Sequence, residues 1–250
     1  MSRWIMERSG DRDPFFEVSI FEYDQLHADL NESKLAVGWS PEALVEEVMV
    51  SPAFWVKDKQ QVEIGRPGAG KILSYWKGTP VLSRRVGHED VWNIGKLNKV
   101  NSAEFVYALD SRVMAAFEGG TDDALNLLEV PDPDVPVFGM EQVAVRVRGA
   151  QSGKEETLVW AVDHEDVWRR HNINAVQYQT GKSLLLAIAL LQQTRYGRQP
   201  LNCCAADLPI SGQDWENIEQ LMTALDICWT DASALALRTA PLGDDFYVPT

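Results

Sequence analysis

The sequence predicts an α+β fold in which antiparallel hairpins pack against helices. Two observations support this prediction. Through the first two thirds of the chain, short runs of β-branched and aromatic residues are separated by turn residues, as is typical of hairpins. In the last third, apolar residues recur at spacings of three and four, as is typical of helices that cover a sheet.

The first expected strand covers residues 15–23. Phe16, Val18 and Ile20 lie on one face of an extended chain, and Glu22 falls in the same register. The opposite face also carries aromatic residues, so the strand is expected to be buried on at least one side.

A helix is expected to begin after Ser40. This residue supplies a hydroxyl N-cap, Pro41 suits the first helical position, and Glu42 places an acid where the helix dipole is positive. Residues 71–76 and 80–86 follow as two strand-like segments with a glycine-containing turn between them, which predicts a hairpin.

Residues 102–117 combine two signals. The segment from Glu104 to Tyr107 has strand propensity, but Phe105, Leu109 and Val113 recur at helical spacing. Two glycines at 119 and 120 then supply a helix stop, so we expect a helix here.

The second half of the chain repeats the hairpin pattern and ends in helices. Residues 143–147 alternate valine with alanine and arginine, and a turn leads into a second strand over 157–162. Residues 183–193 are apolar nearly all round, which predicts a buried helix. Residues 214–229 have the spacing of an amphipathic helix.

Residues 130–136, with three prolines and two acids, are the best linker candidate. The predicted organisation is an N-terminal α+β half over 1–130 and a C-terminal α+β half over 137–250, with a single domain as the alternative.

The charge excludes two classes of partner. The 250 residues contain 23 Lys and Arg against 37 Asp and Glu, a net charge of −14. Phosphate recognition and binding to anionic membranes both depend on basic residues, so direct binding to nucleic acid and binding to a membrane surface are not expected.

A cytoplasmic location is expected. The chain has 3 Cys, too few for a disulfide framework. Residues 1–13 are polar and do not resemble a signal peptide. The longest apolar run, over residues 184–191, is much shorter than the roughly 20 residues of a membrane-spanning helix.

A seven-residue segment occurs twice. Residues 86–92 (VGHEDVW) and 162–168 (VDHEDVW) agree at six positions of seven, and each follows a predicted hairpin. The pattern predicts a duplicated hairpin-turn unit, that is, an internal repeat.

The repeated His-Glu-Asp has two interpretations. Acids in the first turn of a short helix are common, which favours a structural role for both copies. Imidazole and carboxylate are also metal ligands, and the alternative is a divalent-metal site that uses a further histidine seven residues after His164. The candidate metal ligands are His88, Asp90, His164, Asp166 and His171.

Known catalytic motifs are incomplete. Residues 65–72 match the first part of a phosphate-binding loop, but the final Ser or Thr is Ile72, and a strand is predicted where the motif requires a helix. No residue is assigned as catalytic, and no cofactor is predicted apart from the alternative of a divalent metal.

The sequence hypothesis is an acidic intracellular protein that binds a basic protein partner, of the inhibitor, immunity or anti-defence type. A metal-dependent hydrolase that uses the two His-Glu-Asp segments is one alternative, and a viral or assembly structural subunit is another; non-enzymatic function is favoured. The oligomeric state is left open. The acids without a local structural role are the partner-binding candidates: Glu46, Glu47, Asp122, Asp123, Asp244 and Asp245.

Overall fold

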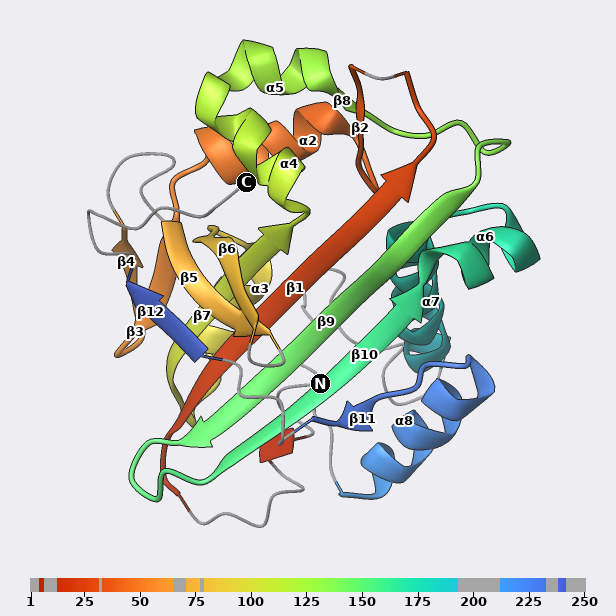
Figure 1. Cartoon of the computed structure of the whole chain (residues 1–250). Helices are drawn as coiled ribbons and strands as arrows, with labels where there is room; N and C mark the ends of the chain where they lie inside the picture. The colour runs from red at the N-terminus through yellow and green to blue at the C-terminus, as the bar shows by residue number, and fades with distance from the viewer. Residues whose placement is uncertain are drawn as a thin grey trace.

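The main element of the fold is one mixed β-sheet (Figure 1). A computed structural model describes residues 5–6, 13–31, 33–64, 71–76, 79–192, 212–232 and 238–241. Ten of the strands in these ranges form the sheet. Eight of them follow the order β11-β10-β9-β1-β7-β6-β5-β12, and the β3–β4 hairpin joins the sheet through β7. Their bounds are β1 (Phe16–Ala28), β3 (Phe54–Lys57), β4 (Gln60–Glu63), β5 (Lys71–Trp76), β6 (Thr79–Arg85), β7 (Val100–Leu109), β9 (Val137–Gly149), β10 (Glu155–Asp163), β11 (Thr230–Asp231) and β12 (Arg238–Pro241).

The central strand β1 joins the two halves of the chain. It pairs in parallel with β7 and antiparallel with β9, so both of its edges are hydrogen-bonded. Glu22 lies opposite Tyr107 of β7, and Asp24 lies opposite Glu141 of β9. These four residues come from three strands and lie in two adjacent cross-strand rows.

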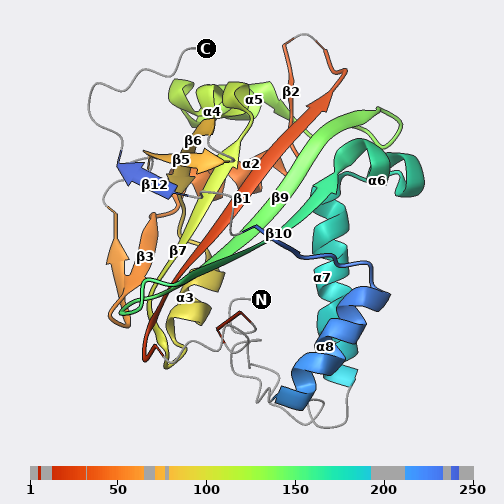
Figure 2. The same cartoon turned by 60° about the horizontal axis from the view of Figure 1, so that its bottom comes forward.

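The helices gather in three places around the sheet. In Figures 1 and 2, α2, α4 and α5 lie together near the ends of β1 and β7, α3 lies beside β7, and α6, α7 and α8 lie together next to β10. A two-stranded sheet of β2 (Leu35–Ala36) and β8 (Leu128–Glu129) completes the fold. The helical bounds are α2 (Pro41–Val45), the π-helix η1 (Glu46–Val50), α3 (Glu89–Gly95), α4 (Ser111–Ala116), the 3-10 helix η2 (Phe117–Gly119), α5 (Thr121–Leu127), α6 (His164–His171), α7 (Ala175–Gln192) and α8 (Gly212–Ala224).

Each face of the sheet has its own core. Ile20 of β1 belongs to the larger core, together with residues of η1, α3 and α4. Phe21, the next residue of β1, points to the opposite face and packs with Val106 of β7 and Ile72 of β5. Alternate residues of β1 therefore belong to different environments.

The predicted fold class is wrong. The hairpins at β5–β6 and β9–β10 exist, but they are not separate antiparallel units packed against helices. Both belong to one mixed sheet that the parallel β1–β7 pair connects. The sequence pattern did not reveal this pairing, because the parallel partners are separated by more than 70 residues of chain.

Two predicted helices need correction. Residues 100–109 form strand β7, and only 111–116 form a helix, because pairing with β1 and β6 favours the strand propensity of this segment. Residues 183–192 are helical within α7, but they are not fully buried: Leu184 is 61% exposed and Leu191 is 49% exposed. This helix contacts β9 and β10 and, in addition, α6 and α8.

Other predicted elements are confirmed. Ser40 caps α2, accepting a hydrogen bond from the Ala43 amide, and Pro41 is the first helical residue. The helix expected over 214–229 is α8, which ends earlier, at Ala224. No helix among the described residues is long and apolar enough to span a membrane. Strands from both sides of residues 131–136 share the main sheet, and the division of the chain at this segment stays a prediction.

Candidate functional site

Three acidic side chains and a tyrosine meet on the helix-covered face of the sheet. Glu22 and Asp24 are two residues apart on β1, so they point to the same face. Tyr107 lies opposite Glu22, and Glu141 lies opposite Asp24. Asp24, Glu141 and Tyr107 are at most 2% exposed, whereas Glu22 is partly exposed. We call Glu22, Asp24, Glu141 and Tyr107 the acid cluster.

A histidine from α6 holds Asp24 in place. His164 is fully buried, and its Nε2 lies 2.9 Å from Oδ1 of Asp24. The Ala175 amide donates to Nδ1 of the same ring at 3.0 Å. Since Nδ1 accepts, Nε2 carries the proton and donates it to Asp24. Both ring nitrogens of His164 are thus engaged.

The environment opposes ionisation of the cluster. Burial raises the pKa of Glu22 to about 8, and the charges of Asp24 and Glu47 act in the same direction. Burial also raises the pKa of Glu141 well above its usual value, followed by the charges of Asp24 and Glu22 and a hydrogen bond to Asp24. Several carboxyls in one desolvated space cannot all be charged at low cost.

Two polar atoms of the cluster lack a hydrogen-bond partner. In the described part of the chain, these are Oη of Tyr107 and Oε2 of Glu141. Burial, followed by the charge of Glu22, raises the pKa of the Tyr107 phenol well above its ordinary value. A buried polar atom without a partner costs about 1–3 kcal/mol, so a water or ligand group that bonds to these two oxygens would stabilise the fold. Nε of Arg84 and Oγ1 of Thr157 are further such atoms among the described residues.

A second group of residues borders the cluster at Glu22. Glu47 of η1 lies 3.9 Å from Nε2 of His88, and burial raises its pKa while His88 lowers it. The charge of Asp90, in the first turn of α3, contributes to the raised pKa of Glu22. The Trp39 ring packs against Tyr107 at 5.6 Å between ring centroids.

The cluster consists of acids, and among the described residues Glu22 and Glu141 have no basic counterpart. No Lys or Arg is among the described groups that shift the pKa of Glu22, Glu141 or Tyr107. A positive group placed here would allow the carboxyls to ionise and would supply hydrogen-bond donors to the unpartnered atoms. The arrangement therefore suits a cation that carries N–H donors.

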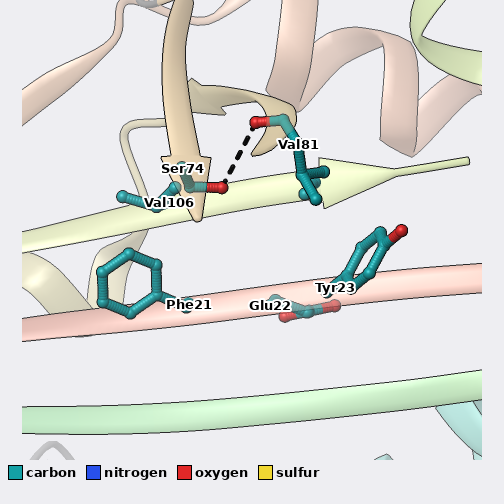
Figure 3. Close-up of a pocket in the computed structure, with 7 residues that line it drawn as sticks. Phe21, Glu22, Tyr23, Ser74, Val81 and Val106 are labelled. Atoms are coloured by element: carbon teal, nitrogen blue, oxygen red, sulfur yellow. Dashed lines mark hydrogen bonds between the residues drawn. The ribbon is translucent and has the colours of Figure 1, made fainter. Parts of the chain in front are cut away.

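A small pocket beside β1, lined by Glu22 of the acid cluster together with Phe21 and Tyr23, does not suit a ligand. Figure 3 shows Phe21 and Tyr23 pointing from β1 toward the β5–β6 hairpin, where Ser74 donates a hydrogen bond of 3.4 Å to the Val81 carbonyl. The space between them does not admit a water-sized molecule. This pocket is a packing gap between the strands.

The candidate metal ligands do not assemble. No group of three or more His, Cys, Asp or Glu side chains in the described ranges has the arrangement of a metal site. His164 uses both nitrogens in the fold, His171 stacks on Tyr178, and Asp166 pairs with Arg170. His88 lies 3.6 Å from Asp90, which is 60% exposed. The divalent-metal alternative is therefore not supported.

The two copies of the repeated segment play different roles. Each begins a short helix with an acidic first turn, but His88 is the N-cap of α3, while Asp163 caps α6 and places His164 inside the helix. The His88 side chain is 30% exposed and that of His164 is 0% exposed. The predicted duplicated unit is wrong, because identical residues occupy different positions.

The acids predicted to bind a partner lie in different parts of the fold. Glu47 borders the acid cluster, and Glu46 precedes it in η1. Asp122 and Asp123 lie in the first turn of α5, where acids stabilise the helix dipole. Asp244 and Asp245 lie outside the described residues. That these acids form a binding surface for a protein partner stays a prediction.

Sequence reasoning missed Asp24, Glu141 and Tyr107. A signal existed, because Glu22 and Asp24 continue the two-residue period of the apolar face that begins at Phe16. An acid in an apolar register is the pattern expected of a functional carboxyl. The pairing of Asp24 with Glu141 depends on sheet register, which the sequence does not show.

Comparison with known proteins gives similarities to solved structures only. No family model and no curated protein matches the sequence. Among solved structures, a homospermidine synthase from Legionella pneumophila, determined in complex with NAD, superposes with a TM-score of 0.54 at 15% sequence identity. The match covers 70% of this chain and 45% of that protein, so the chain spans less than half of its length.

This similarity concerns the fold, and it corrects the predicted function and the predicted lack of a cofactor. The fold is shared with an NAD-binding synthase, which contradicts the inhibitor, immunity or anti-defence hypothesis and the alternatives of a metal-dependent hydrolase and a structural subunit. The prediction of no cofactor is contradicted as well, since the neighbour binds NAD.

The described residues do not themselves fit a dinucleotide. The sequence contains no G-x-G-x-x-G fingerprint of the kind that approaches a pyrophosphate. The N-termini of α2, α3, α4 and α6 are already capped by side chains, and two of these caps are acidic, whereas α5 follows Gly120 and has no side-chain cap. The capping residues are Ser40 of α2, His88 of α3, Asp110 of α4 and Asp163 of α6.

Proposed function

We propose that this chain is the amine-binding part of an enzyme, and that the acid cluster receives an ammonium group. The observation that carries this proposal is the set of Glu22, Asp24 and Glu141 on one face, in which Glu22 and Glu141 have no basic partner among the described residues. Two buried oxygens there, Oε2 of Glu141 and Oη of Tyr107, lack a hydrogen-bond partner. An ammonium group supplies one positive charge, which would offset the carboxylates, and up to three N–H donors, which would bond to the unpartnered oxygens.

The structural similarity supports the same chemistry. The neighbour is a synthase of homospermidine, a polyamine, and it binds NAD. More than half of that protein has no counterpart in this chain. We propose that any nucleotide of such an enzyme binds outside the described residues. The acid cluster would then bind the amine substrate. The cytoplasmic location stays a proposal that fits this role.

Calorimetric titration tests the proposal. The full chain is titrated at pH 8 with butylamine and 1,4-diaminobutane, and with 1-butanol as the neutral control. We expect both amines to bind and the alcohol not to bind. Potassium and magnesium chloride are titrated in parallel, because an amine site should prefer N–H donors to simple ions.

Matched variants locate the site. Glu22→Gln should weaken amine binding at least about tenfold, since a charge partner is lost. Glu17→Gln, an identical change at an exposed position of the same strand, should bind as the wild type does. The proposal is wrong if neither amine binds, or if the two variants bind equally.

A further inference from the structure

The three carboxyls of the acid cluster differ in what they already contact. Asp24 accepts the proton of His164 Nε2 at 2.9 Å, and Glu141 is hydrogen-bonded to Asp24. Both are at most 2% exposed. Glu22 has no hydrogen bond or ion pair among those of the described residues, and it is partly exposed. Glu22 is thus the carboxyl that can meet both a ligand and solvent.

The groups that face Glu22 make its ionisation costly. Acidic groups approach it from its own strand, from both neighbouring strands, and from the helices packed above. The only histidines in this shell are already engaged, His164 with Asp24 and His88 with Glu47 and Asp90. The titratable residues of this shell are Asp24 on β1, Tyr107 on β7, Glu141 on β9, Glu47 on η1, His88, Glu89 and Asp90 on α3, and His164 on α6.

We propose that Glu22 is the proton-exchanging residue of the site, which releases its proton to solvent when an ammonium group binds and takes one back when the amine leaves. This inference rests on the proposed function. In the bound state, the carboxylate of Glu22 faces the ammonium group, and the proton lost from its carboxyl is the only one that leaves. No electron transfer and no other reactant is involved.

The physical reason is that the bound ammonium group replaces the proton of Glu22 as the positive charge next to this carboxyl. Without a ligand, burial and then the charges of Asp24, Glu47 and Asp90 keep the proton on Glu22 and raise its pKa to about 8. A bound ammonium group offsets those charges and favours the ionised form. Amine binding should therefore tighten as pH rises toward 8, by up to about tenfold per pH unit for a one-proton exchange.

Proton counting by calorimetry tests the exchange. Butylamine is titrated into the full chain at pH 7 in buffers of different ionisation enthalpy, which gives the number of protons released per bound amine. We expect close to one for the wild type and for Glu17→Gln, and close to zero for Glu22→Gln.

A spectroscopic measurement covers the case in which Glu22→Gln does not bind. The ¹³C carboxyl resonance of Glu22 in the wild type, assigned by its absence from the variant, should move to the ionised position when butylamine saturates the site at pH 7. Failure of the wild type to bind would overturn the proposed function and this exchange together. Binding without proton release, or with an unmoved Glu22 resonance, would overturn the exchange alone.

Discussion

The two faces of the sheet at β1 and its neighbouring strands both carry buried or partly buried acids, but only those on one face have arginine partners. On one face, Glu104 of β7 accepts from Arg85 Nε at 2.8 Å and from the hydroxyl of Ser19 at 2.9 Å, with Arg146 3.9 Å away. On the other face, Glu22 and Glu141 have no basic neighbour among the described groups. The sheet thus separates Glu104, whose charge is balanced by arginines, from the acid cluster, which has no arginine or lysine among the described groups.

The difference distinguishes a structural acid from a functional one. A partly buried carboxyl that is matched by guanidinium groups fixes the packing of strands and needs nothing more. A carboxyl without such a match has a raised pKa, because burial and nearby acids oppose its ionisation. A positively charged ligand would favour its ionised form. The acid cluster is therefore the part of the fold where we propose that an amine binds.

The largest expected effect is at the one histidine bound within the cluster. His164→Ala removes a fully buried ring and leaves the Asp24 carboxyl and the Ala175 amide without partners. The free energy of unfolding should fall by about 3–5 kcal/mol, measured by urea denaturation. His88→Ala serves as the comparison, and a similar loss there would contradict the different roles of the two histidines.

A smaller effect is expected on the neutralised face. Glu104→Gln leaves the guanidinium groups of Arg85 and Arg146 without their counter-charge, and these side chains are 24% and 17% exposed. Partial solvent screening reduces the cost to about 1–2 kcal/mol of unfolding free energy. Amine binding should not change, and weaker binding would show that the two faces are not independent.

The pH dependence of stability should separate the faces as well. Because the pKa of Glu22 is raised to about 8, the folded chain binds more protons than the unfolded chain below that pH. The free energy of unfolding should then fall as pH rises from about 5 to 8, by at most about 1.4 kcal/mol per unit for one group. Urea denaturation at several pH values should show a flatter profile for Glu22→Gln, and an unchanged profile would contradict the raised pKa.

The smallest effect is expected where a charge pair is exposed. Glu17 lies 3.7 Å from Arg148, and both side chains are about half exposed. Glu17→Gln should change the unfolding free energy by less than about 0.5 kcal/mol. A large loss in thermal or urea denaturation would mean that burial does not decide which ion pairs matter in this sheet.

The sequence predicts local structure here better than topology or function. The cap at Ser40 and the hairpin at 71–86 depend on neighbouring residues, and both are confirmed. The parallel pairing of β1 with β7 and the meeting of Asp24 with Glu141 depend on contacts between distant segments. The repeated His-Glu-Asp segments drew attention away from β1, although Glu22 already stood out as an acid in an apolar register.

The most direct test of the central claim is thermal denaturation with and without 1,4-diaminobutane at pH 8. A ligand that binds only the folded chain raises the midpoint Tm with concentration. We predict that the Tm of the wild type and of Glu104→Gln rises with added diamine, while that of Glu22→Gln does not. An equal rise in Glu22→Gln, or no rise in the wild type, would contradict an amine site at the acid cluster.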